Sequence, residues 1–344
     1  MPKFETILKK FDYYYPSELI AQKPSHPRDS ARLLVYNRKI QKSFFDTFSN
    51  IGKYLPKNSV LVFNQTKVLP ARIIVKKDTG GKAEILYISS DTNFIKVIAD
   101  RKLSLKSKLA ITNDIFFEVT DRVDNFYILK PNFKITQIKQ ILNKYGLTPL
   151  PPYIKNSPLS EKQKRNEYQT VFAKTGLSVA APTASLHFSK KLIANLKKQG
   201  IEVKFITLNV NLGTFAPLKE ENLKSGLLHS EDYEISSKTA RELNQAKKAG
   251  KIIIAVGTTV CRTLESASEN NQIIKFNGNT RLFIQKGYKF QFINSLITNF
   301  HVPKSSLLIL VSALIGRAKL LNLYKIVIRK KYRLFSFGDG MLIH

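Results

Sequence analysis

Ser178-Val-Ala-Ala-Pro-Thr-Ala-Ser-Leu-His-Phe188 is a run of small residues, hydroxyl side chains, one proline and one histidine that follows no helical or strand period. A helix is predicted directly after it, because Ser189 suits an N-cap, Gly200 suits a left-handed end, and apolar residues recur at helical spacing between them. A loop that enters a helix N-terminus presents free N–H groups to an anion. The run therefore indicates a loop at a functional site, and a tight connection that needs small residues only for packing explains it equally well.

Downstream of this run the chain alternates between helices and strands, which favours an α/β fold with a mainly parallel sheet. The expected elements are helix 189–199, strand 201–208, helix 237–249, strand 251–256, helix 259–269, strand 292–298 and helix 305–321. Several of these strands end in polar residues, and ligands bind beyond the carboxyl ends of strands in open α/β sheets. We therefore expect one crevice, closed by the 178–188 loop and lined by Thr214, Thr258, Thr259, Asn299 and His301.

A different pattern occupies residues 72–148. Short β-branched and aromatic runs lie close together between turn residues, at 73–75, 82–88, 93–98, 108–111, 115–119 and 125–129. This spacing predicts a small antiparallel β-barrel. Because the proline-rich segment 149–158 looks like a return crossing, we expect an α/β catalytic domain of residues 1–71 and 149–344, interrupted by a β-barrel domain at 72–148.

The composition indicates a protein that meets a polyanion. The chain has 56 Lys plus Arg against 25 Asp plus Glu, a formal net charge of +31. The basic residues are spread along the chain, which favours nucleic acid over a membrane surface, although a lysine-rich proteome also raises the charge. The single cysteine excludes an internal disulfide, no Cys/His cluster has zinc-site spacing, and the longest apolar run, 307–315, is too short to span a bilayer. We expect a cytoplasmic protein with no metal site and no membrane partner.

Candidate chemical groups gather in the α/β part of the chain. His187, His229 and His301 follow strands or loops there, and each imidazole suits either proton transfer near neutral pH or a structural hydrogen bond. The predicted helix start at 257–259 offers N–H groups and hydroxyls to a carboxylate, a phosphate or a ribose. The sequence contains no glycine-rich nucleotide motif and no nucleophile elbow, so any nucleotide site differs in detail from the Rossmann type.

A series of longer motifs runs in order along the chain from about residue 11 to 343. They include Val62-Phe-Asn-Gln-Thr-Lys-Val-Leu-Pro-Ala-Arg72, Pro149-Leu-Pro-Pro-Tyr-Ile154, Val179-Ala-Ala-Pro-Thr-Ala184, Val256-Gly-Thr-Thr259, Thr298-Asn-Phe-His-Val-Pro303 and Tyr332-Arg-Leu-Phe-Ser-Phe-Gly-Asp339. Over this whole span the chain is similar to the S-adenosylmethionine:tRNA ribosyltransferase-isomerases of queuosine biosynthesis.

The resemblance implies an enzyme that consumes S-adenosylmethionine as a substrate, with no separate cofactor. Its ribosyl group would pass to 7-aminomethyl-7-deazaguanine at the tRNA wobble position, giving epoxyqueuosine and releasing adenine and methionine. The sulfonium acidifies the neighbouring C5′ hydrogen, so a modest base can remove it, and methionine leaves as a neutral thioether. The implied partner is the tRNA anticodon stem-loop, which a basic surface suits. The implied fold is an α/β domain interrupted by a barrel, and we expect a monomer.

The resemblance also extends to individual residues. The expected catalytic residues are His187, His301, His229 and Glu231. The expected substrate-binding residues are Arg72, Ala181, Pro182, Thr183, Ser185, Thr214, Gly257, Thr258, Thr259, Arg262, Glu265 and Asn299. Of these, the threonines at 183, 258 and 259 would hold the nucleoside, and the two arginines would face phosphate or the methionine carboxylate. From spacing alone, Arg262 and Glu265 suit a surface ion pair as well as a site role.

The chain departs from the family pattern at a few positions. Ser185 and Asn211 stand where the family has glycine, Asn209 stands where it has histidine, and Gly226 replaces the first histidine of a His-x-Met-His-x-Glu element. A side chain at a position that needs positive φ costs about 1 kcal/mol or more. An alternative to the enzyme is therefore a divergent tRNA-binding homologue with weakened catalysis. An ordinary methyltransferase is a third possibility, against which the lack of a glycine-rich motif counts.

Overall fold

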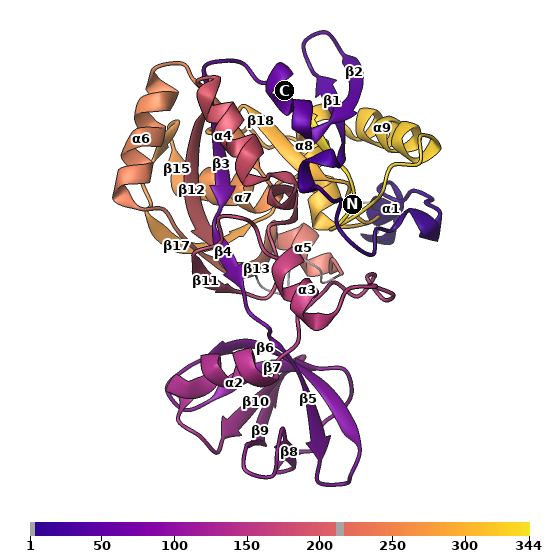
Figure 1. The fold of residues 1–344 in the computed structure, drawn as a ribbon, viewed down its shortest axis with the longest axis vertical. Helices are drawn as coiled ribbons and strands as arrows, with labels where there is room; N and C mark the ends of the chain where they lie inside the picture. Colours follow the sequence, from indigo (N-terminus) through magenta and orange to yellow (C-terminus); the bar gives the residue numbers. More distant parts are fainter. Residues whose placement is uncertain (1–3, 211–216) are drawn as a thin grey trace.

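The computed structural model describes residues 4–210 and 217–344. These residues form an α/β part and a β-barrel that extends from one end of it, joined by two neighbouring segments of chain (Figure 1). Two residues singled out from the sequence, Thr214 and Asn211, lie outside the described residues.

The α/β part is built on a nine-stranded sheet. Its strands, from edge to edge, are β17 (Asn277–Leu282), β13 (Leu227–Glu234), β12 (Glu202–Leu208), β3 (Ser59–Asn64), β14 (Ile252–Val256), β18 (Ser295–Asn299), β19 (Gly340–Ile343), β1 (Arg32–Asn37) and β2 (Lys42–Thr47). Only β12, β3, β14 and β18 form an unbroken parallel block among the described strands. The expectation of a mainly parallel sheet is not confirmed, because β19 runs antiparallel to β18 and hairpin-like partners at both edges also pair antiparallel. The sheet is mixed.

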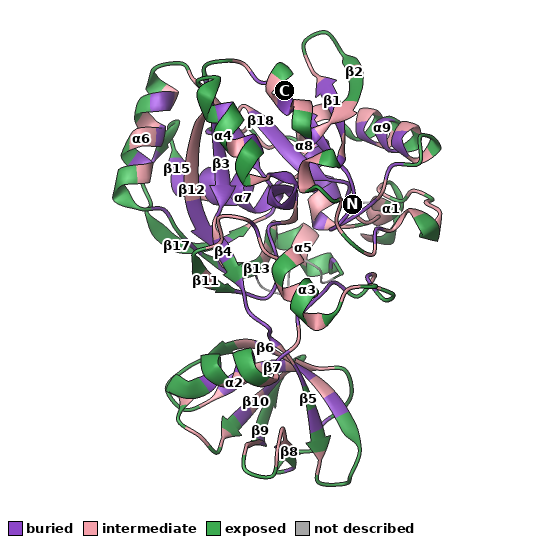
Figure 2. Ribbon diagram, viewed as in Figure 1, coloured by how far each residue is buried: buried purple, intermediate pink, exposed green. Residues whose placement is uncertain are grey.

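Burial on both faces fixes the central strands in place. Alternate side chains of β3 enter opposite cores, Val60 and Val62 on one face and Leu61 and Phe63 on the other, because successive side chains of a strand point to opposite faces. Figure 2 shows these central strands buried, while the outer surfaces of the helices and of the barrel are exposed. The central strands are therefore held between two apolar cores, and the polar residues that follow them start from fixed positions.

Helices cover both faces of the sheet. On one face lie α4 (Lys190–Lys198) and the short 3₁₀ helix η5 (Thr183–His187), and on the other lie α6 (Ser237–Lys248), α7 (Thr258–Ala267), α8 (Ser306–Ile315) and α9 (Arg317–Arg329). The remaining helices of the α/β part, α1 (Phe4–Lys9), α3 (Glu161–Glu167) and α5 (Glu220–Ser225), have no buried residues. Ser189 accepts a hydrogen bond from Leu192 N at 3.0 Å, which confirms the predicted N-cap of α4. Gly200, after α4, has a φ of +85°, as its left-handed end required.

The single helix expected at 305–321 is wrong. The chain forms α8 and α9 instead, bent by 110° around Gly316, whose φ of +82° interrupts the helical path. Within the described ranges no single helix is long and apolar enough to cross a membrane, and only this bent pair passes a test of length and composition.

The predicted antiparallel barrel is confirmed. Six strands close it, in the order β10 (Phe126–Pro131), β7 (Ile95–Ala99), β6 (Lys82–Ser90), β5 (Arg72–Lys77), β8 (Lys108–Ala110) and β9 (Phe116–Val123). The short runs read from the sequence correspond to these strands, and their inward residues, with α2 (Ile138–Tyr145), make a separate apolar core. The barrel therefore has a core of its own.

The chain enters and leaves the barrel at one point. Arg72 and Leu147 exchange two backbone hydrogen bonds, of 3.2 Å and 2.6 Å, so the two crossing segments are paired. Gly146 makes this approach possible, because a Cβ built there lies 1.8 Å from Pro70 O and 2.5 Å from Leu142 O.

Replacing Gly146 with alanine is expected to destabilise the protein by more than about 2 kcal/mol, because the clash is with backbone atoms that cannot rotate away. Thermal unfolding of the purified variant measures the effect. Gly81→Ala is the matched control, since its Cβ meets only the flexible Lys77 side chain, at 3.3 Å. Equal melting temperatures for the two variants would show that the crossing tolerates a side chain.

Candidate active site

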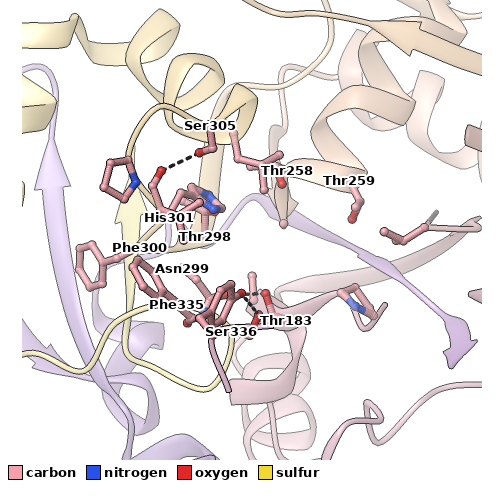
Figure 3. A pocket seen from close by; sticks show the side chains of 18 of the residues that line it. Thr183, Thr258, Thr259, Thr298, Asn299, Phe300, His301, Ser305, Phe335 and Ser336 are labelled. Atoms are coloured by element: carbon pink, nitrogen blue, oxygen red, sulfur yellow. Dashed lines mark hydrogen bonds between the residues drawn. The ribbon is translucent and has the colours of Figure 1, made fainter. Parts of the chain in front are cut away.

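A cavity of about 360 Å³ lies beyond the carboxyl ends of β14 and β18 (Figure 3). Four segments that are far apart in sequence form most of its wall: 181–184, 257–259, 298–305 and 335–336. Since β14 and β18 are parallel neighbours, the residues that follow them meet at the same edge of the sheet. The cavity therefore lies where the strand-end pattern predicted a crevice.

Many of the residues singled out from the sequence line this cavity. They are Ala181, Pro182, Thr183, Gly257, Thr258, Thr259, Asn299 and His301. The 178–188 run closes one side, and α7 begins on another. The structure brings these residues together in one cavity wall, and the chemical role of each side chain stays a prediction.

Sequence reasoning missed an aromatic and polar part of the wall formed by Tyr153, Phe335 and Ser336. The rings of Tyr153 and Phe335 pack with centroids 5.0 Å apart, and the Tyr153 hydroxyl lies 2.7 Å from Ser336 Oγ. Phe335 has a φ of +69°, a conformation that costs a non-glycine residue about 1–3 kcal/mol and is concentrated at functional sites. These residues belong to quoted motifs, yet no period or charge in the sequence marks them as cavity-lining.

The Asn299 side chain joins three segments of the wall. Its Oδ1 accepts a hydrogen bond from Thr183 Oγ1 at 2.9 Å, and its Nδ2 donates to the carbonyl oxygen of Phe335 at 3.2 Å. The same Nδ2 lies 3.2 Å from His187 Nε2, which therefore acts as the acceptor. Asn299 thus uses both ends of its amide to hold the wall together.

His187, which is buried, and His301, which is half-buried, are both electrically neutral. His301 lines the cavity, with Nε2 2.8 Å from Thr298 Oγ1, and burial lowers its pKa to about 3. His187 lies behind Asn299 and stacks on Phe48 at 4.1 Å. Burial and the nearby charges of Arg333 and Arg28 lower the pKa of His187 to about 3 as well. Both side chains are therefore unprotonated at neutral pH, which is the form that can accept a proton.

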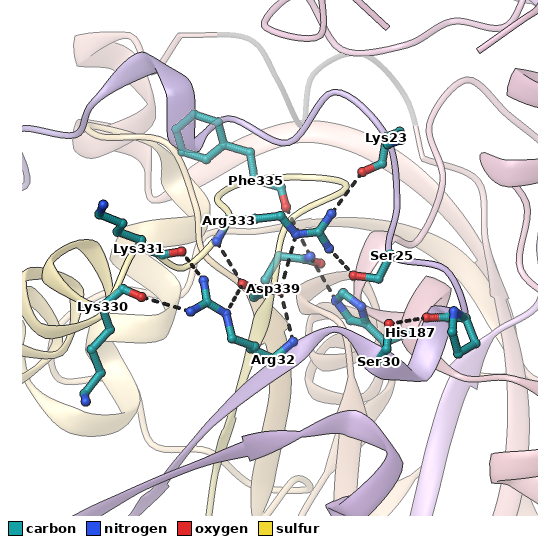
Figure 4. Close-up of polar contacts among 12 residues, drawn as sticks. Lys23, Ser25, Ser30, Arg32, His187, Lys330, Lys331, Arg333, Phe335 and Asp339 are labelled. Carbon is teal, nitrogen blue, oxygen red and sulfur yellow. Dashed lines mark hydrogen bonds and ion pairs between the residues drawn. The ribbon is translucent and has the colours of Figure 1, made fainter. Parts of the chain in front are cut away.

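Asp339 holds the loop that presents Phe335 and Ser336 (Figure 4). Its buried carboxylate accepts hydrogen bonds from the backbone N–H of Arg32 at 3.0 Å and of Arg333 at 2.8 Å. It also accepts from Arg32 Nε at 3.2 Å, so strand β1 and the loop are fastened to one anion. This anchor keeps the strained Phe335 in position against the cavity.

Of the two alternatives for Arg262 and Glu265, the surface ion pair is wrong, because both side chains are buried. Arg262 pairs instead with Glu231 of β13 and donates to the carbonyl oxygen of Leu282 at 3.0 Å. Glu265 accepts N–H donors of the 291–293 backbone at 2.8–3.0 Å. Burial at these positions favours partners from other elements over the neighbour three residues along the helix.

Other expected site residues lie outside the cavity lining. Arg72 donates to Leu150 O at 2.9 Å and pairs with Glu84 at 3.2 Å where the chain enters the barrel. His229 is exposed on β13. Ser185 is buried in η5 and its hydroxyl has no hydrogen-bond partner among the described residues, but its φ is not positive, so the strain expected at this position is not found.

Comparison with known proteins identifies the family. Residues 8–343 match the family model described as queuosine biosynthesis protein. The chain belongs to this family. It is 46% identical over 342 residues to the S-adenosylmethionine:tRNA ribosyltransferase-isomerase of Carboxydothermus hydrogenoformans, covering 98% of this chain and 99% of the relative. The protein of the same name from Fusobacterium nucleatum is 44% identical over 349 residues, covering 99% of this chain and 98% of that one.

The queuosine biosynthesis family also includes a solved structural neighbour of this chain. The crystal structure of S-adenosylmethionine tRNA ribosyltransferase from Thermotoga maritima is 32% identical in sequence, with a TM-score of 0.57. The match covers 97% of this chain and 100% of that one. The relatives therefore correspond to both the α/β part and the barrel.

Lowering the pH from 7 to 5 is expected to destabilise the protein. The unfolded chain takes up protons below a histidine pKa of about 6.5, while the folded chain keeps His187 and His301 neutral down to about 3. Stability is therefore lost as the pH falls below 6.5, on the order of 2 kcal/mol for each histidine at pH 5. The free energy of unfolding, measured with urea at pH 7 and pH 5, should fall by about 2 kcal/mol less in His301→Gln than in the wild type. An unchanged pH dependence in the variant would mean that folding does not lower the pKa of His301.

Proposed function

We propose that the cavity is where this chain transfers and isomerises the ribosyl group of S-adenosylmethionine. The acceptor is 7-aminomethyl-7-deazaguanine at the tRNA wobble position, and the products are epoxyqueuosine, adenine and methionine. One observation carries the proposal: the motifs at 149–154, 179–184, 256–259, 298–303 and 332–339 lie far apart in sequence and all contribute to one cavity wall. Relatives named for this reaction match the chain over nearly its full length.

The cavity suits a nucleoside substrate. Its volume of about 360 Å³ is in the range of small-molecule sites, roughly 300–1,000 Å³. The rings of Tyr153 and Phe335 offer apolar surface to a base, and Thr183 and Ser336 add hydroxyls on the same side of the wall. S-adenosylmethionine is consumed in the reaction, so the proposal includes no further cofactor.

His301 is the proposed proton acceptor. It lines the cavity, whereas His187 lies behind Asn299 and His229 is exposed on β13. A neutral imidazole with a lowered pKa is a weak base, and the substrate offsets this weakness because the sulfonium acidifies its C5′ hydrogen. Glu231 is proposed to hold Arg262 in place through their buried ion pair.

The tRNA anticodon stem-loop is proposed to approach across residues 10–15, which contact residues of the cavity wall. Tyr13 donates a hydrogen bond to the carbonyl oxygen of His301, and the Tyr15 ring packs 5.0 Å from Phe335. Tyr14, between these two anchored residues, is 84% exposed. An exposed ring on a fixed backbone is a surface on which an unpaired base can stack.

Basic residues accompany Tyr14. Arg317 Nη1 donates to the carbonyl oxygen of Lys10 at 3.1 Å, and both residues are exposed. Lys304 lines the cavity, and its side chain is 46% exposed. These cations and the net charge of +31 suit a phosphate backbone.

The remaining features of the proposal concern organisation. Residues 1–71 and 149–344 act as a catalytic domain, with the barrel at 72–148 as an inserted domain. The enzyme is proposed to act as a monomer. A tRNA substrate supports a cytoplasmic location.

The purified protein is expected to release adenine from S-adenosylmethionine in the presence of tRNA that carries the deazaguanine precursor, and to form epoxyqueuosine detectable by nucleoside mass analysis. His301→Ala should slow adenine release by about 100-fold or more while leaving tRNA binding within about twofold, because it removes general base catalysis. Adenine release no faster than without enzyme would favour the weakened homologue, and S-adenosylhomocysteine as the product would favour a methyltransferase. His187→Ala and His229→Ala, assayed in parallel, test the choice of base.

Replacing Tyr14 with alanine is expected to raise the KM for tRNA by about tenfold, because a base–aromatic stack contributes about 1–3 kcal/mol. The KM for S-adenosylmethionine should not change. Tyr14→Phe is the matched control, since it keeps the ring and removes only the hydroxyl. If alanine leaves the KM for tRNA unchanged, the stem-loop does not stack at this position.

A further inference from the structure

Helix α7 begins at the cavity without a side-chain cap. Its N-cap residue is Gly257, at a φ of +103°, and no side chain accepts a hydrogen bond there. The first N–H groups of a helix have no partner within the helix, and the helix dipole adds a partial positive charge at this end. The start of α7 therefore offers backbone donors to an anion in the cavity.

A second observation points to a ligand at the same place. The Thr259 side chain lines the cavity and is only 8% exposed, yet its Oγ1 has no hydrogen-bond partner within the described part of the chain. A buried hydroxyl without a partner is costly, on the order of 1–3 kcal/mol. In Figure 3, Thr258 and Thr259 lie to the right of Phe300 and Phe335.

The arginines expected to meet an anion are engaged elsewhere. Arg262 is buried against Glu231, Arg72 pairs with Glu84 at the barrel, and neither lines the cavity. Lys304 does line it, but its Nζ pairs with Asp12 at 2.7 Å. Of these groups, only the start of α7 combines a place in the wall with uncommitted donors.

We propose that the N-terminus of α7 and the Thr259 hydroxyl bind the carboxylate of the methionyl group of S-adenosylmethionine. This inference rests on the proposed function. The carboxylate is the only anionic group of that substrate, and helix N-termini bind carboxylates through backbone N–H groups. The adenosine then lies toward Tyr153 and Phe335, so the methionyl and adenosyl groups occupy opposite ends of the cavity.

The test compares S-adenosylmethionine with its decarboxylated analogue, which lacks only the carboxylate. Isothermal titration of the wild-type full-length protein should give a Kd about tenfold or more higher for the analogue. Thr259→Val keeps the shape of the side chain and removes the hydroxyl, and it should weaken S-adenosylmethionine about tenfold, as expected for a hydrogen bond to a charged group. The same variant should bind the analogue as tightly as the wild type does.

Thr263→Val is the matched control on the same helix. Its hydroxyl donates to the carbonyl oxygen of Thr259 at 2.9 Å and lies outside the cavity lining, so both Kd values should match those of the wild type. If Thr259→Val weakens both ligands equally, or neither, the carboxylate subsite is overturned and the proposed function stands. If the wild type binds neither ligand, the proposed function fails and the subsite fails with it.

Discussion

The cavity depends on one side-chain amide. Asn299 ends strand β18, and its three polar contacts reach two residues of the 183–187 turn, Thr183 and His187, and the loop that contains Phe335. The strand, the turn and the loop are distant from one another in sequence. An aspartate at this position would offer no donor to the carbonyl oxygen of Phe335 or to the neutral imidazole. The amide is therefore the chemical group that satisfies all three neighbours at once.

Neutrality is a recurring property of this site. The imidazoles of His187 and His301 are uncharged, Lys304 of the cavity wall pairs with Asp12, and the Arg262–Glu231 pair and Asp339 lie outside the described lining. A substrate that brings its own positive sulfonium thus meets a wall of low charge, lined by aromatic rings and hydroxyls. The basic character of the chain remains on its surface, where a polyanion can reach it.

Features that depend on residues close together in sequence were predictable, and features that depend on distant residues were not. The barrel and the helix–strand alternation were predictable, because short-range periodicity and turn residues determine them. Thr258, Asn299 and His301 were placed together by a general rule about strand ends. The mixed sheet was not predictable, since the partner of an edge strand depends on contacts far along the chain. The partner of Arg262 was not predictable for the same reason. Arg262 pairs with Glu231 on β13, and helical spacing had suggested Glu265.

The paired crossings at Arg72 and Leu147 explain how two independent cores can share one chain. Because the outgoing and returning segments exchange backbone hydrogen bonds, the gap between them is only as wide as two adjacent strands. For the α/β sheet, the whole barrel is therefore equivalent to one surface loop. The strand order of the sheet does not depend on the structure of the barrel. All the described residues that line the cavity belong to the α/β part, so the paired crossing keeps the fold of the barrel separate from the fold that builds the cavity.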